Sequence, residues 1–286
     1  MAETGKGEQG SRTAKLTAGM RAMESEKPEG KRLCYDSYAR RFAGSEGMEF
    51  AQKMVNALPM AVMVQAVRTR YIDDYLRQRV VAGIEQIVIF GAGYDSRALR
   101  VKEIKERIPV FEIDEPATSR AKQETVKAVE GALPSWVIYI SVDFMKETLE
   151  DLKGKMLERS YSPQQKNLFI VEGVMGYLDA EAVDNLLLFI SSFAGSDSSV
   201  IFDYHDRAKL HQRFAKFTEK FKKIGEPVSF GIDSTRIGKF LEKRGYQNVY
   251  SLAIDEIKLR YQQGLRTLDS GYFFATAEVK RGASNG

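Results

Sequence analysis

The chain has 286 residues, a length that suits one large domain or a core domain with a cap. Hydrophobic residues make up 43% of it, and this share excludes a disordered protein because it is enough to build a packed interior. The net charge of +4 is too small to indicate a nucleic-acid surface, which usually concentrates basic side chains in a patch.

Cysteine and histidine are too rare to suggest a metal site. Cys34 has no second cysteine with which to form a disulfide or a zinc cluster, and His205 and His211 lack the spacing of a helical zinc pair. The polar start of the chain lacks the apolar core of a signal peptide, and no apolar run approaches the roughly 18 residues of a membrane span. These features predict a cytoplasmic protein that binds neither a metal nor a membrane.

Residues 1–82 are expected to form an N-terminal helical segment that packs on a core of residues 83–286. Apolar residues recur at helical spacing between residues 47 and 82, among them Met54 and Leu58, and Pro59 is expected to kink this helix or begin a new one. Residues 13–38 predict shorter helices joined by turns.

From Ile84 onward, short apolar runs alternate with polar or helical stretches. Five such runs predict a parallel sheet covered on both faces, and two later runs suit an antiparallel pair at the sheet edge, so the expected fold is α/β. The seven predicted strands are Gln86–Phe90, Val110–Ile113, Trp136–Val142, Leu168–Val171, Val200–Phe202, Asn248–Ile254 and Tyr272–Val279.

Residues 206–224 have the pattern of an amphipathic helix, with Leu210, Phe214 and Phe217 on one face and basic residues around it. Two interpretations are open. The helix either caps the active site, as part of an insertion of residues 206–235, or packs on the core with a solvated basic face.

Gly91, Ala92 and Gly93 follow the first predicted strand, where an open α/β sheet binds its ligands. Two glycines permit a tight turn and a close approach to a ligand. Ser96 occupies the third glycine position of a dinucleotide fingerprint, so the turn suits a cofactor without phosphates better than it suits a dinucleotide.

Polar residues follow the next three strands. Asp114 can accept hydrogen bonds from both ribose hydroxyls of S-adenosylmethionine (SAM) or NAD. Asp143 and Phe144 could hold an adenine, and Glu172 could attract a sulfonium or ammonium group. Each of these acids could instead lie on the surface or form a structural ion pair.

The motifs GAGYDSR, FEID, VDF and VEGVMGYL occur here in the order and spacing of the leucine carboxyl methyltransferase family. The chain is particularly similar to the microbial branch, which includes polyketide carboxyl O-methyltransferases of the tetracenomycin type, and the similarity covers most of residues 11–280. It implies a class I, Rossmann-like methyltransferase fold with SAM as cofactor. By this resemblance the cofactor-binding residues would be Arg21 and Arg68 for the methionine carboxylate, the Gly91–Gly93 turn, Asp114 for the ribose, Asp143 and Phe144 for the adenine, and Glu172 near the methionine end.

The acceptor decides the remaining chemistry. A carboxylate, with a pKa near 4, is ionised at neutral pH and needs no general base, which fits a chain with two histidines. His205 or Tyr204 could instead deprotonate a phenol or hydroxyl, with Glu172 as the third candidate catalytic residue. We therefore expect O-methylation of a small, polyketide-like carboxylate. The alternative acceptors are a phenol or hydroxyl and a protein C-terminus. The alternative functions are those of an NAD-dependent oxidoreductase and of a non-catalytic SAM-binding protein. The protein could be a monomer or a homodimer.

Overall fold

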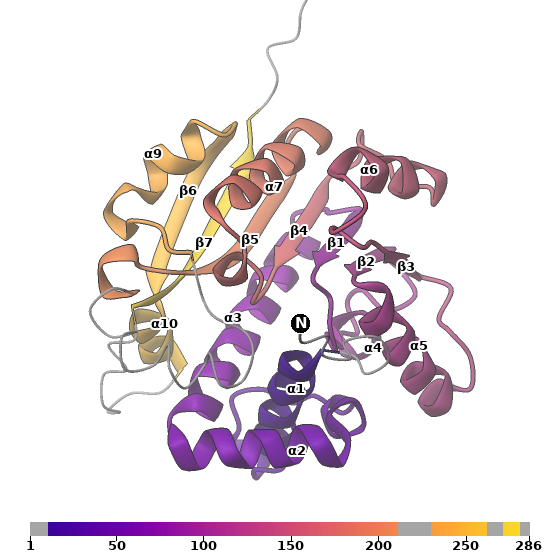
Figure 1. Cartoon of the computed structure of the whole chain (residues 1–286), viewed down its shortest axis with the longest axis vertical. Coiled ribbons are helices and arrows are strands. Elements are labelled where there is room, and N and C mark those ends of the chain that lie inside the picture. Colours follow the sequence, from indigo (N-terminus) through magenta and orange to yellow (C-terminus); the bar gives the residue numbers. More distant parts are fainter. Residues whose placement is uncertain (1–10, 211–229, 262–270, 281–286) are drawn as a thin grey trace, which may run out of the picture. The chain divides into compact units, whose positions relative to one another are not determined.

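The computed structural model describes residues 11–210, 230–261 and 271–280. Its strands form one seven-stranded sheet in the order β3-β2-β1-β4-β5-β7-β6 (Figure 1). The strands are β1 (Gln86–Phe90), β2 (Val110–Asp114), β3 (Val137–Ser141), β4 (Asn167–Val171), β5 (Ser199–His205), β6 (Tyr246–Ala253) and β7 (Tyr272–Val279). The helices include α1 (Arg12–Ser25), α2 (Ala39–Ala57), α3 (Ala61–Val81), α4 (Arg97–Arg100), α5 (Pro116–Glu130), α6 (Leu149–Glu158), α7 (Ala180–Phe193), α9 (Ile237–Glu242) and α10 (Ile254–Tyr261), with short 3-10 helices η1 (Glu29–Lys31), η2 (Met175–Tyr177) and η3 (Ser234–Arg236).

Strand pairing confirms the predicted α/β fold of five parallel strands and an antiparallel terminal pair. β4 pairs in parallel with β1 and β5, β2 pairs in parallel with β3, and β7 runs antiparallel to both β5 and β6. The fifth strand was predicted to end at Phe202, three residues before its observed end at His205. Asp203, Tyr204 and His205 continue β5 because they pair with β7, a partner far away in the sequence.

The chain divides into two compact units, of which the first contains residues up to Tyr75 together with Ala92–Thr148. In it, α1 packs against α2, where Lys15 and Glu46 form an ion pair of 2.6 Å. The break expected at Pro59 is present, since α2 ends at Ala57 and α3 begins at Ala61. The domain boundary expected between residues 82 and 83 stays a prediction.

The second unit contains Leu76–Gly91 and the residues from Leu149 onward. β1 and β4 are buried along their whole length, and β5 is buried up to Tyr204. α7 buries one apolar face, and the ring of its Phe189 meets that of Phe90 edge to face at 6.4 Å. Among the described helices, none combines the length and the apolar character that crossing a membrane requires.

Candidate active site

The turn after β1 has the backbone that its glycines predict. Gly91 and Gly93 have φ angles of 59° and 45°, in the left-handed region that side chains disfavour. A Cβ atom on Gly91 would lie 2.5 Å from Cγ2 of Val174, so the position has no room for a side chain. Beyond Gly91, the amide of Ala92 donates to the carbonyl oxygen of Ile113 at 3.1 Å, which ties the turn to β2.

Asp114, at the tip of β2, accepts hydrogen bonds from the turn and from its own neighbour. The amide of Gly93 donates to Oδ2, and the amide of Glu115 donates to Oδ1 at 2.7 Å. Burial raises the pKa of the Asp114 carboxyl, although these two amides act in the opposite direction. Because each carboxylate oxygen has two lone pairs, both can still accept a ligand hydroxyl, and the expected ribose site is chemically feasible.

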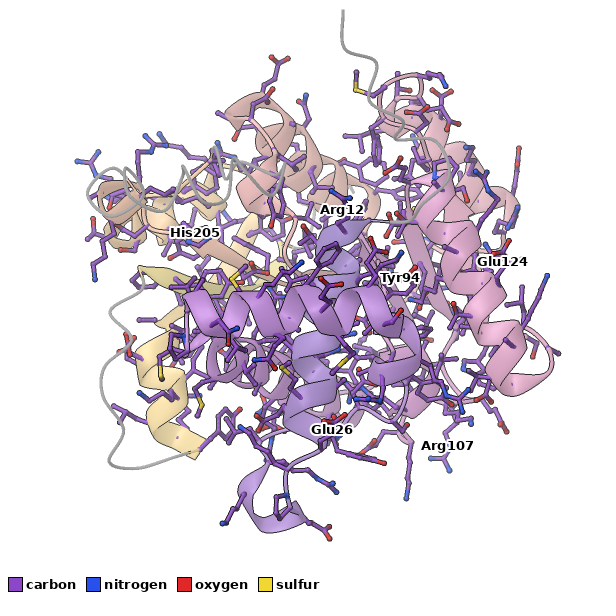
Figure 2. All side chains as sticks on the ribbon, turned by 60° about the horizontal axis from the view of Figure 1, so that its bottom comes forward. Arg12, Glu26, Tyr94, Arg107, Glu124 and His205 are labelled. Atoms are coloured by element: carbon purple, nitrogen blue, oxygen red, sulfur yellow. The ribbon has the colours of Figure 1, made fainter. Side chains whose placement is uncertain are left out.

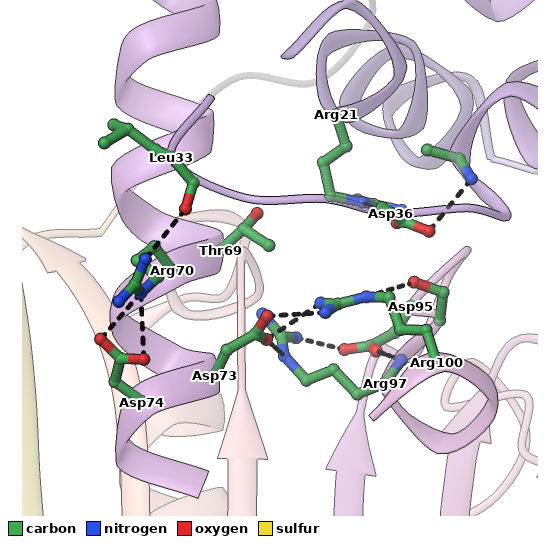
Figure 3. Close-up of polar contacts among 12 residues, drawn as sticks. Arg21, Leu33, Asp36, Thr69, Arg70, Asp73, Asp74, Asp95, Arg97 and Arg100 are labelled. Carbon is green, nitrogen blue, oxygen red and sulfur yellow. Dashed lines mark hydrogen bonds and ion pairs between the residues drawn. The ribbon is translucent and has the colours of Figure 1, made fainter. Parts of the chain in front are cut away.

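Arg21 on α1 lies beside Asp36 (Figure 3) and contacts the same turn. Its Nε donates to Oδ2 of Asp36 at 2.8 Å, and its Nη2 donates to the carbonyl oxygen of Tyr94 at 2.6 Å. Burial by itself raises the pKa of Asp36, but the guanidinium groups of Arg21 and Arg100 outweigh it and hold this pKa below its usual value. The structure therefore gives Arg21 a role in holding the turn, beside the predicted role in binding SAM.

A second buried ion-pair network fixes the start of α4 (Figure 3). Asp73 on α3 accepts from Nε of Arg97 at 2.8 Å and from Nη1 of Arg100 at 2.6 Å. Arg97 also pairs with Asp95, and Arg100 donates to Oγ of Ser96 at 2.9 Å. The sequence alone assigned no role to Asp73, Arg97 or Arg100, because their charges find these partners only when α3 and α4 meet.

Tyr94 is buried between the helical segment and the turn (Figure 2 labels it, together with Glu124 on α5). Its ring centroid lies 5.3 Å from that of Phe42 on α2. Burial raises the pKa of the Tyr94 hydroxyl, and the charges of Asp114, Glu46 and Glu124 raise it further. The side chain thus stays neutral at physiological pH and closes the inner side of the turn.

The other predicted cofactor residues of the first unit lie at its surface or near it. Asp143 follows β3 and pairs with Lys146 at 2.9 Å, and its neighbour Phe144 is 53% exposed. An exposed ring at a strand end is available to a planar ligand. Arg68 is half-buried on α3. The predicted roles of these three residues in binding SAM stay predictions.

In the second unit, Glu172 is half-buried directly after β4, as expected. The next residue, Gly173, has a φ of 67°, and its amide donates to Oδ1 of Asp203 at 2.6 Å. Oδ2 of Asp203 accepts from the hydroxyl of Tyr272 at 2.5 Å. Sequence reasoning assigned no role to Asp203 or Tyr272, because strands β4, β5 and β7 join them only in the folded chain.

Tyr204 and His205 lie on opposite faces of β5, since successive side chains of a strand alternate. Tyr204 is buried, and its hydroxyl is 2.9 Å from Oγ of Ser251. His205 is half-buried, with its ring centroid 4.9 Å from that of Tyr272. The surroundings of Tyr204 favour a packing role, while His205 lies at the carboxyl end of the strand, where ligands bind.

The first and last residues of the expected cap insertion, residues 206–235, lie next to each other at the end of β5, where hydrogen bonds connect them. The amide of Ile232 donates to the carbonyl oxygen of His205 at 2.9 Å, and the amide of Ser234 donates to Asp206 at 3.0 Å. Residues 211–229, which contain most of the predicted amphipathic helix, lie outside the described residues. The cap itself stays a prediction.

Comparison with known proteins identifies the family, since the model of the leucine carboxyl methyltransferase family matches residues 14–191. The chain belongs to this family. A predicted SAM-dependent methyltransferase of Mycobacteroides abscessus is 33% identical over 200 residues, which are 66% of this chain and 64% of that protein, so the chain spans less than two thirds of this relative's length. Another from Mycolicibacterium smegmatis is 28% identical over 253 residues, covering 82% of this chain and 81% of the relative.

Solved structures show the same fold. A DUF574 family protein from Streptomyces avermitilis has a TM-score of 0.62 at 12% identity and covers 92% of this chain and 97% of its own. A predicted methyltransferase from Thermobifida fusca also has a TM-score of 0.62, at 13% identity, with coverage of 93% and 94%. The chain thus shares the fold of these structures and belongs to a family of SAM-dependent methyltransferases, as predicted, and its relatives support SAM, not NAD, as the cofactor.

Proposed function

We propose that this methyltransferase transfers the methyl group of SAM to a carboxylate oxygen of a small, polyketide-like acid. The observation that carries the proposal is that Tyr204, one of the two candidate bases, is buried with its hydroxyl hydrogen-bonded to Oγ of Ser251, and burial raises its pKa to about 12. A hydroxyl so placed is a poor base at neutral pH. A carboxylate acceptor, with a pKa near 4, needs no base.

The glycine turn and Asp114 have the chemistry that an adenosyl group requires: a turn with two glycines, and a half-buried carboxylate whose oxygens can accept further hydrogen bonds. Arg68 would bind the methionine carboxylate through its planar guanidinium group. Bound SAM supplies a methyl group already activated by the sulfonium charge. The residues of the chain then need only orient the two reactants and exclude water, effects that can contribute about 7–11 kcal/mol in well-aligned systems.

A phenol or hydroxyl acceptor is the second candidate, because His205 is half-buried at the carboxyl end of β5. An imidazole in that position could act as the general base for such an acceptor. A protein C-terminus is a further source of carboxylate.

The test uses SAM labelled in the methyl group with a panel of aromatic and polyketide acids, the matching phenols, and peptides with free C-termini. Mild base hydrolyses a methyl ester and releases labelled methanol, whereas an aryl methyl ether survives. Base-labile label on the small acids is the expected result. Base-stable label on phenols would overturn the carboxylate proposal, and label on the peptides alone would overturn the small-acid proposal.

A further inference from the structure

Asp203 joins three strands within the second unit. It lies on β5, it is 5% exposed, and its two oxygens accept from a residue after β4 and from the first residue of β7, Tyr272. Hydrogen bonds to an ionised carboxylate are stronger than those between neutral groups. Burial inside the sheet further strengthens them, because the local dielectric constant is low.

The turn that Asp203 holds carries two features of the predicted cofactor site. Gly173 stands between Glu172, whose carboxylate is expected to attract the cationic end of SAM, and Val174, whose Cγ2 packs over Gly91. Its φ of 67° is sparsely populated and persists because the surrounding contacts hold it. The amide bond to Asp203 is one such contact, at 2.6 Å.

We propose that Asp203, itself oriented by the Tyr272 hydroxyl, is a positioning residue for SAM binding that acts through Glu172. The inference rests on the proposed role of Glu172 in the cofactor site. Both Asp203 and Tyr272 lie beyond residue 191, where the match to the family model ends. Displacing a carboxylate by about 1 Å is enough to weaken an interaction that depends on alignment and distance.

The test is a double-mutant cycle on the dissociation constant of SAM, measured by calorimetry without an acceptor. Asp203→Asn keeps the shape of the side chain but loses the charge and the ability to accept at both oxygens. We expect it to weaken SAM binding about tenfold in the presence of Glu172 and less than about twofold in a Glu172→Gln background, since residues that act as a unit are non-additive. Equal losses in both backgrounds, or no loss in either, would overturn the proposal.

A pair of tyrosine variants separates positioning from general stability. Tyr272→Phe removes the donor to Asp203, and Tyr246→Phe removes a buried hydroxyl of the same unit that donates to the carbonyl oxygen of Leu187 at 2.8 Å. We expect both variants to lower the melting temperature by similar amounts. Only Tyr272→Phe should also weaken SAM binding, by about threefold. If Asp203→Asn does not fold, Tyr272→Phe replaces it in the cycle, and the proposal then requires its threefold loss of SAM affinity to disappear in the Glu172→Gln background. Because no acceptor is present, failure of the carboxylate proposal leaves this result unchanged.

Discussion

The guanidinium group of Arg21 donates to the carbonyl oxygen of Tyr94 at 2.6 Å while it pairs with the buried carboxylate of Asp36. A residue of α1 therefore holds the turn that follows β1, where the cofactor is predicted to bind. The contribution of this contact can be measured as stability.

Replacing Arg21 by Met should lower the free energy of unfolding by about 3–5 kcal/mol, because it leaves the charge of Asp36 buried without its partner. Chemical denaturation measures the loss. Arg40→Met is the control: Arg40 pairs with Glu26 at the exposed surface, and its loss should stay within about 0.5 kcal/mol. Equal effects of the two variants would contradict the buried-network interpretation.

Gly91→Ala should both destabilise the protein and weaken SAM binding, since it combines a positive φ with a Cβ 2.5 Å from Val174. Gly131→Ala is the matched control: its φ of 81° is also positive, but nothing lies within 4 Å of the added atom, so it should cost only about 1 kcal/mol. Adding Val174→Ala should recover part of the Gly91→Ala loss in melting temperature. No recovery would show that backbone strain alone is responsible.

Asp114→Ala should weaken SAM binding by at least about 100-fold, because hydrogen bonds to a charged group contribute roughly 1.5–3 kcal/mol each and Asp114 is predicted to accept from two ribose hydroxyls. Calorimetry with SAM provides the measurement. The neighbouring Glu115 is exposed, and Glu115→Ala should leave the affinity within about twofold. If both variants bind like the wild-type protein, Asp114 does not contact the cofactor.

His205→Ala distinguishes the two acceptor classes. With a carboxylate acceptor, kcat should fall less than about fivefold, since no proton has to be removed, whereas loss of a general base costs about 100-fold or more. The comparison requires SAM affinity to be unchanged, which calorimetry checks. A large fall in kcat with normal SAM binding would favour the phenol alternative.

Glu112 predicts a pH dependence of stability. Burial raises its pKa to about 7, despite Lys122 at 2.7 Å. Because this value lies above the ordinary value of 4.5, the native state holds an extra proton between the two, and the free energy of unfolding should fall as pH rises through that window, by about 1–3 kcal/mol. A Glu112→Gln/Lys122→Met double variant should lack this component. Parallel stability curves for the two proteins from pH 5 to 8 would contradict the prediction.

Much of the fold could be predicted because its signals are local. The apolar runs give β1 and β7 their correct bounds, and Pro59 marks the break between α2 and α3. The carboxyl end of β5 could not be predicted. Asp203 and His205 are polar, and they become strand residues only by pairing with β7, some 70 residues later.

The glycines after β1 and the acid at the tip of β2 were visible in the sequence, because a positive φ requires a residue type and a strand end fixes a position. The roles of Arg21 and Asp203 were not visible. A charged side chain can point to any partner within reach, and only the meeting of α1 with the glycine turn, and of β4 with β5 and β7, decided which partner each has. Local residue patterns thus determined the strands and the glycine turn, and the family resemblance implied the cofactor class, while long-range packing decided which partners these charges have.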